Sequence, residues 1–142
     1  MKTVNQIIAR KESVVWTVKA DQPVLDAIKI MAEKEIGALL VTSGDELTGI
    51  VSERDYAREV ILRGKSSHET PVSDIMTTNV VSVAAGDSID RCMELMTEHK
   101  IRHLPVIEQG KIIAVLSIGD LVAEIIAEQK SDIQHLEGYI MS

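Results

Sequence analysis

Two stretches of the chain match each other without a gap, and they decide the fold: residues 14–61 (VVWTVKADQPVLDAIKIMAEKEIGALLVTSGDELTGIVSERDYAREVI) and residues 79–126 (NVVSVAAGDSIDRCMELMTEHKIRHLPVIEQGKIIAVLSIGDLVAEII). The offset is a constant 65 residues, and most apolar positions that differ exchange one aliphatic residue for another. Identical pairs include Val18/Val83, Ala20/Ala85, Met31/Met96, Ile36/Ile101, Leu39/Leu104, Val41/Val106, Ser52/Ser117 and Asp55/Asp120. An ungapped repeat of this length indicates two copies of one structural unit.

Each copy predicts the element order β-α-β-β-α. Apolar residues alternate or run together in the short expected strands, and they recur every three or four positions in the expected helices. Pro and Ser favour the start of a helix, and Gly with polar neighbours favours a hairpin turn. The expected elements are strands at 14–18 and 80–83, helices that start at Pro23 and Ser88, hairpins of 38–42 with 48–52 and of 104–107 with 112–117, and closing helices at about 54–62 and 120–129.

The two copies are expected to pack against each other. Neither copy is large enough to bury both its sheet face and its helix stripes, so we expect an α/β (α+β) fold in which two repeats pack sheet to sheet around a pseudo-twofold axis. The predicted division is a first repeat (1–63), an exposed connector (64–71), a second repeat (72–130) and a C-terminal helical tail (131–142). A weaker echo precedes each copy, where residues 4–8 match residues 72–76 at an offset of 68.

The apolar helix faces predict a homodimer, because two-fold pairing is the commonest closure for soluble chains. The tail keeps apolar residues at helical spacing, which predicts a short helix docked on this chain or on a second copy. The side chains behind these predictions are Ile28, Met31, Ala32, Met93 and Met96 on the outer helix faces, and Ile133, Leu136 and Ile140 in the tail.

The composition narrows the classes of function. The chain has 142 residues, a formal net charge of −7, no Phe and one Cys, Cys92. A basic face for nucleic acid and a set of aromatic rings for single strands are both lacking, so no nucleic-acid partner is expected. One cysteine cannot form an internal disulfide, and no apolar run is long enough for a signal peptide or a membrane span. We therefore expect a cytoplasmic protein with no membrane partner.

Three motifs carry a resemblance to a known family: GIVSERDY (49–56), its counterpart AVLSIGDL (114–121), and IRHLPV (101–106). With the repeat in register, the chain resembles a tandem cystathionine-β-synthase-type (CBS) domain pair, often called a Bateman module, from residue 3 to about residue 126. The resemblance implies a stand-alone regulatory module with adenosine-bearing nucleotides bound in the cleft between the repeats. The candidate ligands are AMP, ADP, ATP and NAD(H), with S-adenosylmethionine less favoured, and no catalytic cofactor is expected. The module would signal occupancy to an unidentified regulated protein.

The Ser-x-x-Asp motifs, Ser52 with Asp55 and Ser117 with Asp120, have a physical reason to bind a nucleotide. Each serine ends an expected strand just before a helix, where backbone N–H groups and the positive helix end favour phosphate. The aspartate would accept hydrogen bonds from the ribose hydroxyls, as acidic residues do in other nucleotide sites. The alternative is that both residues only cap the helix. Two copies in register favour ligand binding.

The basic candidates for phosphate contacts are unequally placed. Arginine suits phosphate because its planar donors bind two oxygens together, and the alternative is a solvated surface charge. The basic residues Arg54, Arg102 and His103 have Gly119, Gly37 and Ala38 as their repeat counterparts, so the two sites are expected to differ. By resemblance, the other positions that line the site are Thr17, Val18, Ile36, Ser82, Val83, Ile101 and Pro105. Leu40 matches Pro105 in the first copy, a departure from the commoner proline that we interpret as a packing change.

Other chemistry has little support in the sequence. His99 and His103 are four residues apart but lack the acidic residue of a zinc-protease helix, so no metal site is expected. Cys92 matches Ala27 in the repeat, which predicts a small core residue. The sequence shows no phosphate-binding loop, nucleophile elbow or Cys/His pair, so an enzyme is not expected. Two alternatives stay open: a scaffold with an empty cleft, and, least favoured, an enzyme that acts on a nucleotide.

Overall fold

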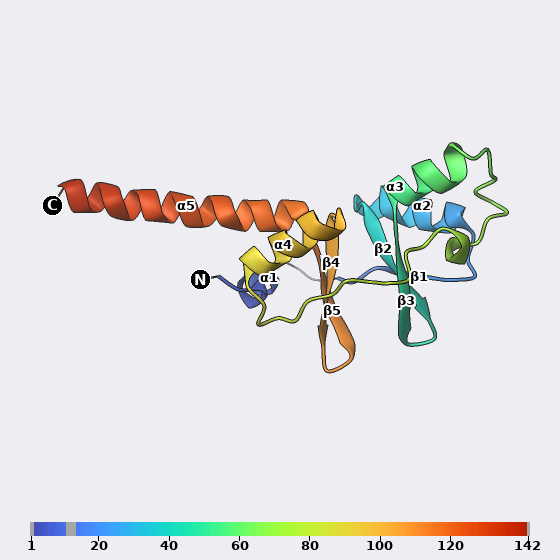
Figure 1. Cartoon of the computed structure of the whole chain (residues 1–142), viewed down its shortest axis with the longest axis horizontal. Coiled ribbons are helices and arrows are strands. Elements are labelled where there is room, and N and C mark those ends of the chain that lie inside the picture. The colour runs from blue at the N-terminus through green and yellow to red at the C-terminus, as the bar shows by residue number, and fades with distance from the viewer. Residues whose placement is uncertain (1, 11–13, 142) are drawn as a thin grey trace. The chain divides into compact units, whose positions relative to one another are not determined.

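The computed structural model describes residues 2–10 and 14–141, and the chain divides into two compact units (Figure 1). One unit is Trp16–Val80, and the other joins Met1–Val15 to Val81–Ser142. Each unit encloses its own apolar core, one that includes Val18, Met31 and Val51 and one that includes Val83, Met96 and Leu116. The mixed α/β fold with two β-α-β-β-α repeats is confirmed.

The unit Trp16–Val80 is a three-stranded sheet with helices. β1 pairs in parallel with β2, and β2 pairs antiparallel with β3 through the predicted hairpin. Pro23 is the residue before α2, as the sequence predicts. The elements are β1 (Thr17–Lys19), α2 (Val24–Lys34), β2 (Ala38–Ser43), β3 (Glu46–Ser52), α3 (Glu53–Tyr56), which continues into the π-helical turn η1 (Ala57–Ile61), and the 3-10 turn η2 (Val72–Asp74).

The other unit repeats this order around a two-stranded sheet. Ser88 caps its first repeat helix as predicted, since its side chain accepts a hydrogen bond from the N–H of Arg91 at 3.0 Å. The expected strand at 80–83 is reduced to a single parallel bridge from Val83 to Val106, and the strand expected at 14–18 begins only at Thr17. The elements are α1 (Val4–Arg10), α4 (Ile89–His99), β4 (His103–Glu108), β5 (Lys111–Ser117) and α5 (Ile118–Met141).

The echo that precedes each copy has a structural basis. The segment before the first copy packs within the unit of the second copy, and the segment before the second copy packs within the unit of the first. Three pairs of equivalent backbone bonds hold the two segments. The N–H of Val4 donates to the carbonyl of Asp87 as that of Val72 does to Gln22, and the N–H of Asn5 donates to Ala85 as that of Ser73 does to Ala20, all at 2.9 Å. In return, the N–H of Ile89 donates to the carbonyl of Lys2 at 3.2 Å, as that of Val24 does to Thr70 at 2.8 Å. The compact units therefore exchange these segments relative to the sequence repeats.

Two expectations about helix faces are wrong. Met31 and Met96, predicted on outer faces, are only 1% and 3% exposed, because these faces of α2 and α4 lie against their sheets and not toward solvent. Of the other side chains predicted there, Ala32 is exposed, whereas Ile28 and Met93 are half-buried. The helical positions alone do not say on which side of the helix the sheet lies. The dimer prediction therefore loses Met31 and Met96 as support and stays a prediction.

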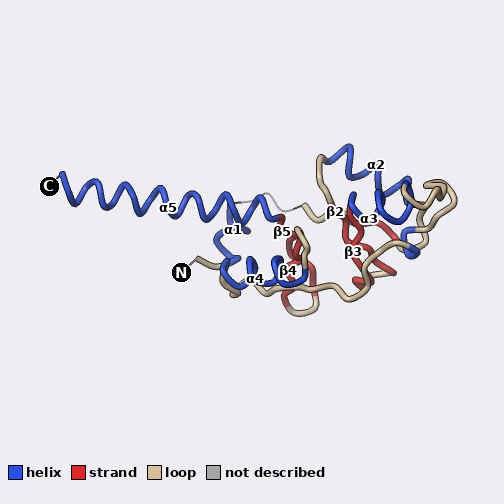
Figure 2. Tube along the Cα trace, turned by 45° about the horizontal axis from the view of Figure 1, so that its top comes forward, coloured by secondary structure: helices blue, strands red, loops and turns tan. Residues whose placement is uncertain are grey.

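The connector and the tail also differ from their predictions. Residues 64–66 are exposed as expected, but Thr70 is buried by its contact with the start of α2. The tail is no separate helix, since α5 runs without a break for 24 residues (Figure 2). Its last part does not dock on this chain, because residues 129–141 are all exposed. Docking on a second copy stays open.

Candidate functional site

The strand-to-helix junction of the unit Trp16–Val80 brings together four predicted site residues of the first copy: Gly37, Ala38, Ser52 and Asp55. Ser52 ends β3 and pairs in register with Ala38, the first residue of β2. The N–H of Glu53, the first residue of α3, donates to the carbonyl of Gly37 at 3.1 Å. The loop before β2 and the Ser-x-x-Asp motif therefore lie side by side.

The other unit builds the same junction from the second copy. Ser117 ends β5 and pairs in register with His103, the first residue of β4. The N–H of Ile118 donates to the carbonyl of Arg102 at 2.9 Å, which is the counterpart of the bond to Gly37. The basic pair of the second copy thus takes the backbone positions that Gly37 and Ala38 hold in the first.

Each aspartate closes a capping box with its serine. The backbone N–H of Ser52 donates to Oδ2 of Asp55 at 2.8 Å, and the N–H of Asp55 donates to Oγ of Ser52 at 3.2 Å. Ser117 and Asp120 repeat both bonds at the same distances, and all four residues are half-buried. The capping role is therefore real in both copies. It does not exclude a ligand, since the capping bonds use one carboxylate oxygen and a carboxylate accepts about four hydrogen bonds.

The basic side chains lie at the surface of these junctions. Arg54 and Arg102 are exposed and His103 is half-buried. No ion pair ties either arginine to another residue in the part of the chain that the structure describes. Gly119, which replaces Arg54 in the second copy, is exposed, and a Cβ there would meet only Oγ of Ser117 at 3.6 Å. Packing therefore does not require glycine at this position.

The remaining predicted positions divide into exposed and buried side chains. Thr17 and Ser82 are exposed, and Ile36, Gly37 and Ile101 are half-buried. Four of these residues are buried: Val18 and Val83, which belong to the apolar cores, and Ala38 and Pro105, which lie on the opposite face of their strands from the core residues Leu39 and Leu104. Val83 uses its own backbone groups in the sheet, where its N–H donates to the Pro105 carbonyl at 3.0 Å and its carbonyl accepts from Ile107 at 2.9 Å. Leu40, the counterpart of Pro105, is also buried.

Gly49, the first residue of the GIVSERDY motif, has a packing role. A Cβ at this position would lie 2.8 Å from Sδ of Met76 and 2.8 Å from the carbonyl oxygen of Thr77. Ile50 and Thr77 exchange two backbone hydrogen bonds, of 3.0 and 2.9 Å, which hold the Met76–Thr77 backbone against β3. The glycine therefore permits close approach of this segment.

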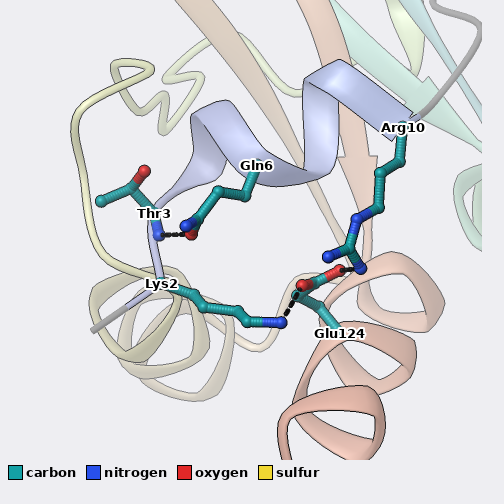
Figure 3. A network of polar contacts seen from close by, with 5 residues as sticks. All are labelled: Lys2, Thr3, Gln6, Arg10 and Glu124. Carbon is teal, nitrogen blue, oxygen red and sulfur yellow. Dashed lines mark hydrogen bonds and ion pairs between the residues drawn. The ribbon is translucent and has the colours of Figure 1, made fainter. Parts of the chain in front are cut away.

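Sequence reasoning missed the ion cluster around Glu124 (Figure 3). Oε1 of Glu124 accepts from Nζ of Lys2 at 2.7 Å, and Oε2 accepts from Nη1 of Arg10 at 2.9 Å. The Glu124 side chain is 6% exposed. The cluster therefore ties Lys2, just before α1, and Arg10, the last residue of α1, to α5. Its repeat counterpart, Glu59, pairs with Arg63 at the surface at 3.1 Å, so the repeat alone gives no signal for it.

Cys92 behaves as the small core residue that its match to Ala27 predicts. It is fully buried, and burial raises the pKa of its thiol from 9.0 to about 11, with a smaller contribution from the negative charge of Asp87. Within residues 2–10 and 14–141, no three His, Cys, Asp or Glu side chains gather closely enough to hold a metal ion. No helix in those ranges is long and apolar enough to cross a membrane.

Comparison with known proteins adds a family to this geometry. The family model described as "CBS domain" matches residues 4–62 and 72–127. A mitochondrial CBS domain-containing protein, CBSX3, from Arabidopsis thaliana is 42% identical over 125 residues, which are 84% of this chain and 61% of the plant protein. A second Arabidopsis protein, CBSCBSPB1, is 37% identical over 115 residues, 80% of this chain and 21% of that protein. The chain thus spans less than two thirds of the length of both plant relatives.

A solved structure is similar to this chain in both sequence and fold. A candidate signal-transduction protein with CBS domains from Burkholderia ambifaria is 53% identical, with a TM-score of 0.87. The match covers 90% of this chain and 96% of that one. The resemblance that the motifs predicted is therefore confirmed.

Proposed function

Because this chain belongs to the CBS domain family, with two copies of the domain in tandem, we propose that it is a regulatory module that binds an adenine nucleotide and signals its presence to a protein partner. CBS domains generally bind adenosine ligands, and CBS-domain proteins without a catalytic domain are typically regulatory. The two junctions at Ser52–Asp55 and Ser117–Asp120 are the candidate binding points.

The observation that supports this proposal is the repetition of one arrangement in both units. A serine at a strand end holds an aspartate in a fixed position through the same bonds of 2.8 and 3.2 Å. A capping box alone needs no particular neighbour, yet in both copies the loop before the middle strand is bonded to the residue after the serine. The aspartates would bind the ribose hydroxyls. The serine and aspartate N–H groups, and the N–H of the residue after each serine, already donate within the junctions, so phosphate would be bound by the exposed basic side chains.

The basic residues would make the two binding points unequal. Arg54 stands at the first junction, and Arg102 with His103 stands at the second. An arginine bound to phosphate contributes about 1.5–3 kcal/mol, which corresponds to tenfold selectivity or more between ligands that differ in phosphate number. We therefore expect that the affinity for AMP depends on one of the two arginines, and the affinity for ATP or NADH on the other.

The experiment is a thermal-shift panel with AMP, ADP, ATP, NADH and S-adenosylmethionine. A ligand at about 100 times its Kd adds about 2.7 kcal/mol to stability, enough to raise Tm by several degrees. Asp55→Asn combined with Asp120→Asn should abolish that shift while retaining both capping boxes, because the side-chain oxygen of asparagine can still accept a hydrogen bond from the serine N–H. The matched control is Asp45→Asn, which makes the same charge change in the exposed turn between β2 and β3.

Two other results would replace the proposal. If no nucleotide raises Tm, the scaffold alternative is correct and the junctions serve only as caps. If the purified wild-type protein releases phosphate from ATP steadily, it is an enzyme that acts on a nucleotide.

A further inference from the structure

The chain exposes two large apolar side chains where η1 ends. Ile61, the last residue of η1, is 57% exposed and Leu62 is 79% exposed, whereas Val60 just before them is 1% exposed and belongs to the core of its unit. Single exposed apolar residues are common on protein surfaces, but contiguous ones mark interaction sites. In the second copy Ala127 takes the position of Leu62, so the repeated unit does not require a large side chain there.

Basic side chains flank this apolar pair. Arg58, Arg63 and Lys65 are all exposed. The acidic residue among residues 58–65 is Glu59, which pairs with Arg63 at 3.1 Å. The whole chain has a formal net charge of −7, so this stretch is opposite in sign to the protein that carries it. Residues 58–65 therefore combine an apolar pair with a local excess of positive charge.

The backbone of this stretch also differs from its repeat counterpart. The N–H of Leu62 donates to the carbonyl of Ala57, and the N–H of Lys65 donates to that of Val60, both at 3.0 Å. Each bond reaches back five residues, where an α-helix reaches back four. The aligned part of α5 continues as a regular helix instead. Such π-helical turns are rare and are frequent at functional sites.

The connector that follows is fastened to α2, as the loop that returns to the start of that helix shows (Figure 1). The carbonyl of Ser67 accepts from the N–H of Leu25 at 3.0 Å, and that of Thr70 accepts from Val24 at 2.8 Å. Residues 58–65 are thus held between the core at Val60 and the start of α2. A surface that is already ordered loses little conformational entropy when it binds.

We propose that residues 58–65 form a docking surface for an acidic segment of a partner protein that carries an apolar side chain beside its carboxylates. Ile61 and Leu62 would bury apolar area against that side chain. Arg58 and Lys65 would face the carboxylates, which gives the contact its specificity. The proposal rests on the proposed function only in assuming a protein partner, and docking needs no bound nucleotide.

Three other occupants fit these residues less well. An anionic membrane attracts clusters of about four to eight basic residues, and this stretch has three on a protein of net charge −7. A nucleic acid would find no aromatic ring among residues 58–65 on which a base could stack. A second copy paired through the same surface would place identical basic side chains opposite each other, because a two-fold contact is self-complementary.

A phage-displayed library of random peptides, selected on the wild-type chain without nucleotide, tests the docking. The enriched peptides should carry Asp or Glu beside an apolar residue and should bind in solution with micromolar affinity, measured by fluorescence anisotropy. Leu62→Asp should weaken that binding at least about tenfold, because it removes apolar area and adds a like charge. The matched control is Leu136→Asp, the same change at a side chain that is 64% exposed in the other unit, and it should bind like the wild type.

Charge variants test the electrostatic part. Arg58→Gln combined with Lys65→Gln should weaken peptide binding on the order of threefold to tenfold at low salt, and added salt should weaken the wild-type complex. The control is Lys111→Gln combined with Lys130→Gln, which removes two exposed positive charges from the other unit and should bind like the wild type. All these side chains are exposed, so each variant should melt like the wild type.

The proposal is overturned if no peptide is enriched, if the enriched peptides lack acidic residues, or if they bind Leu62→Asp as tightly as the wild type. Vesicles of phosphatidylserine and phosphatidylcholine that bind the wild type but not Leu62→Asp would assign the surface to a membrane instead. Self-association that Leu62→Asp abolishes in sedimentation velocity would assign it to a second copy. If no nucleotide raises Tm while the peptides still bind, the proposed function fails and the docking surface stands.

Discussion

Removing either the acid or the two cations of the Glu124 cluster tests how α1 is held on α5. The Glu124 carboxylate is 6% exposed, whereas the side chains of its partners Lys2 and Arg10 are 23% and 60% exposed. If the acid is removed, both cations can turn toward water. If the cations are removed, the carboxylate stays buried without an opposite charge. The two perturbations should therefore have unequal effects on stability.

The magnitudes follow from this asymmetry. Glu124→Gln keeps the shape of the side chain and weakens two charge-assisted hydrogen bonds to ordinary ones, while it removes the cost of burying a charge, so the net loss is about 1–2 kcal/mol. Lys2→Met combined with Arg10→Met leaves the buried carboxylate unpaired and should cost about 3–5 kcal/mol. Adding Glu124→Gln to that double variant should restore about 2 kcal/mol, because the unpaired charge then disappears.

Urea unfolding followed by circular dichroism at pH 7 measures the free energy of unfolding of all four proteins at one protein concentration. The free energy of unfolding should fall in the order wild type, Glu124→Gln, triple variant, double variant. Equal losses for Glu124→Gln and for the double cation variant would refute the reasoning, as would a triple variant less stable than the double variant.

Three further predictions concern the cores. Met96→Ala should cost about 2–5 kcal/mol in urea unfolding, because Met96 is 3% exposed, and a loss under 1 kcal/mol would contradict its place in the core. Gly49→Ala should cost about 1–3 kcal/mol, because its Cβ would lie 2.8 Å from the Thr77 carbonyl oxygen. The change at the counterpart position, Ala114→Gly, creates no such clash and is the control. A Gly49→Ala protein as stable as the wild type would contradict the close approach. Between pH 9 and 11 the unfolded chain releases the Cys92 proton while the folded chain retains it, so stability should fall as the pH rises, by roughly 2 kcal/mol, and Cys92→Ala should fall less steeply over the same range.

The repeat made most of the fold predictable, and two of the features that were missed lie outside the repeated segments. Each copy supplies its own turn signals, so the hairpins and the start of α2 and α4 could be placed from sequence. The exchange of the segments at Val4 and Val72 could not, because a five-residue echo does not reveal which copy receives it. The end of the closing helix of the second copy, predicted at about residue 129, was also misjudged: no Gly or Pro between residues 120 and 137 interrupts α5, so nothing in that stretch stops the helix.

The candidate site was predictable to the level of its backbone. The register of Ser52 with Ala38 and of Ser117 with His103 follows from the hairpin pattern and the aligned motifs. Capping and ligand binding use the same side chains, so sequence cannot separate the two roles. The Glu124 cluster was beyond reach, because its partners lie more than 100 residues away and the repeat offers no equivalent contact.

Calorimetric titration with AMP tests the central claim most directly, with the wild type compared against Asp55→Asn, Asp120→Asn and the control Asp45→Asn. Charge-assisted hydrogen bonds contribute about 1.5–3 kcal/mol each, so the account predicts that each site variant lowers the affinity of one binding point at least about tenfold while Asp45→Asn binds like the wild type. Binding of unchanged affinity and stoichiometry in both site variants would contradict the claim that Asp55 and Asp120 hold the nucleotide.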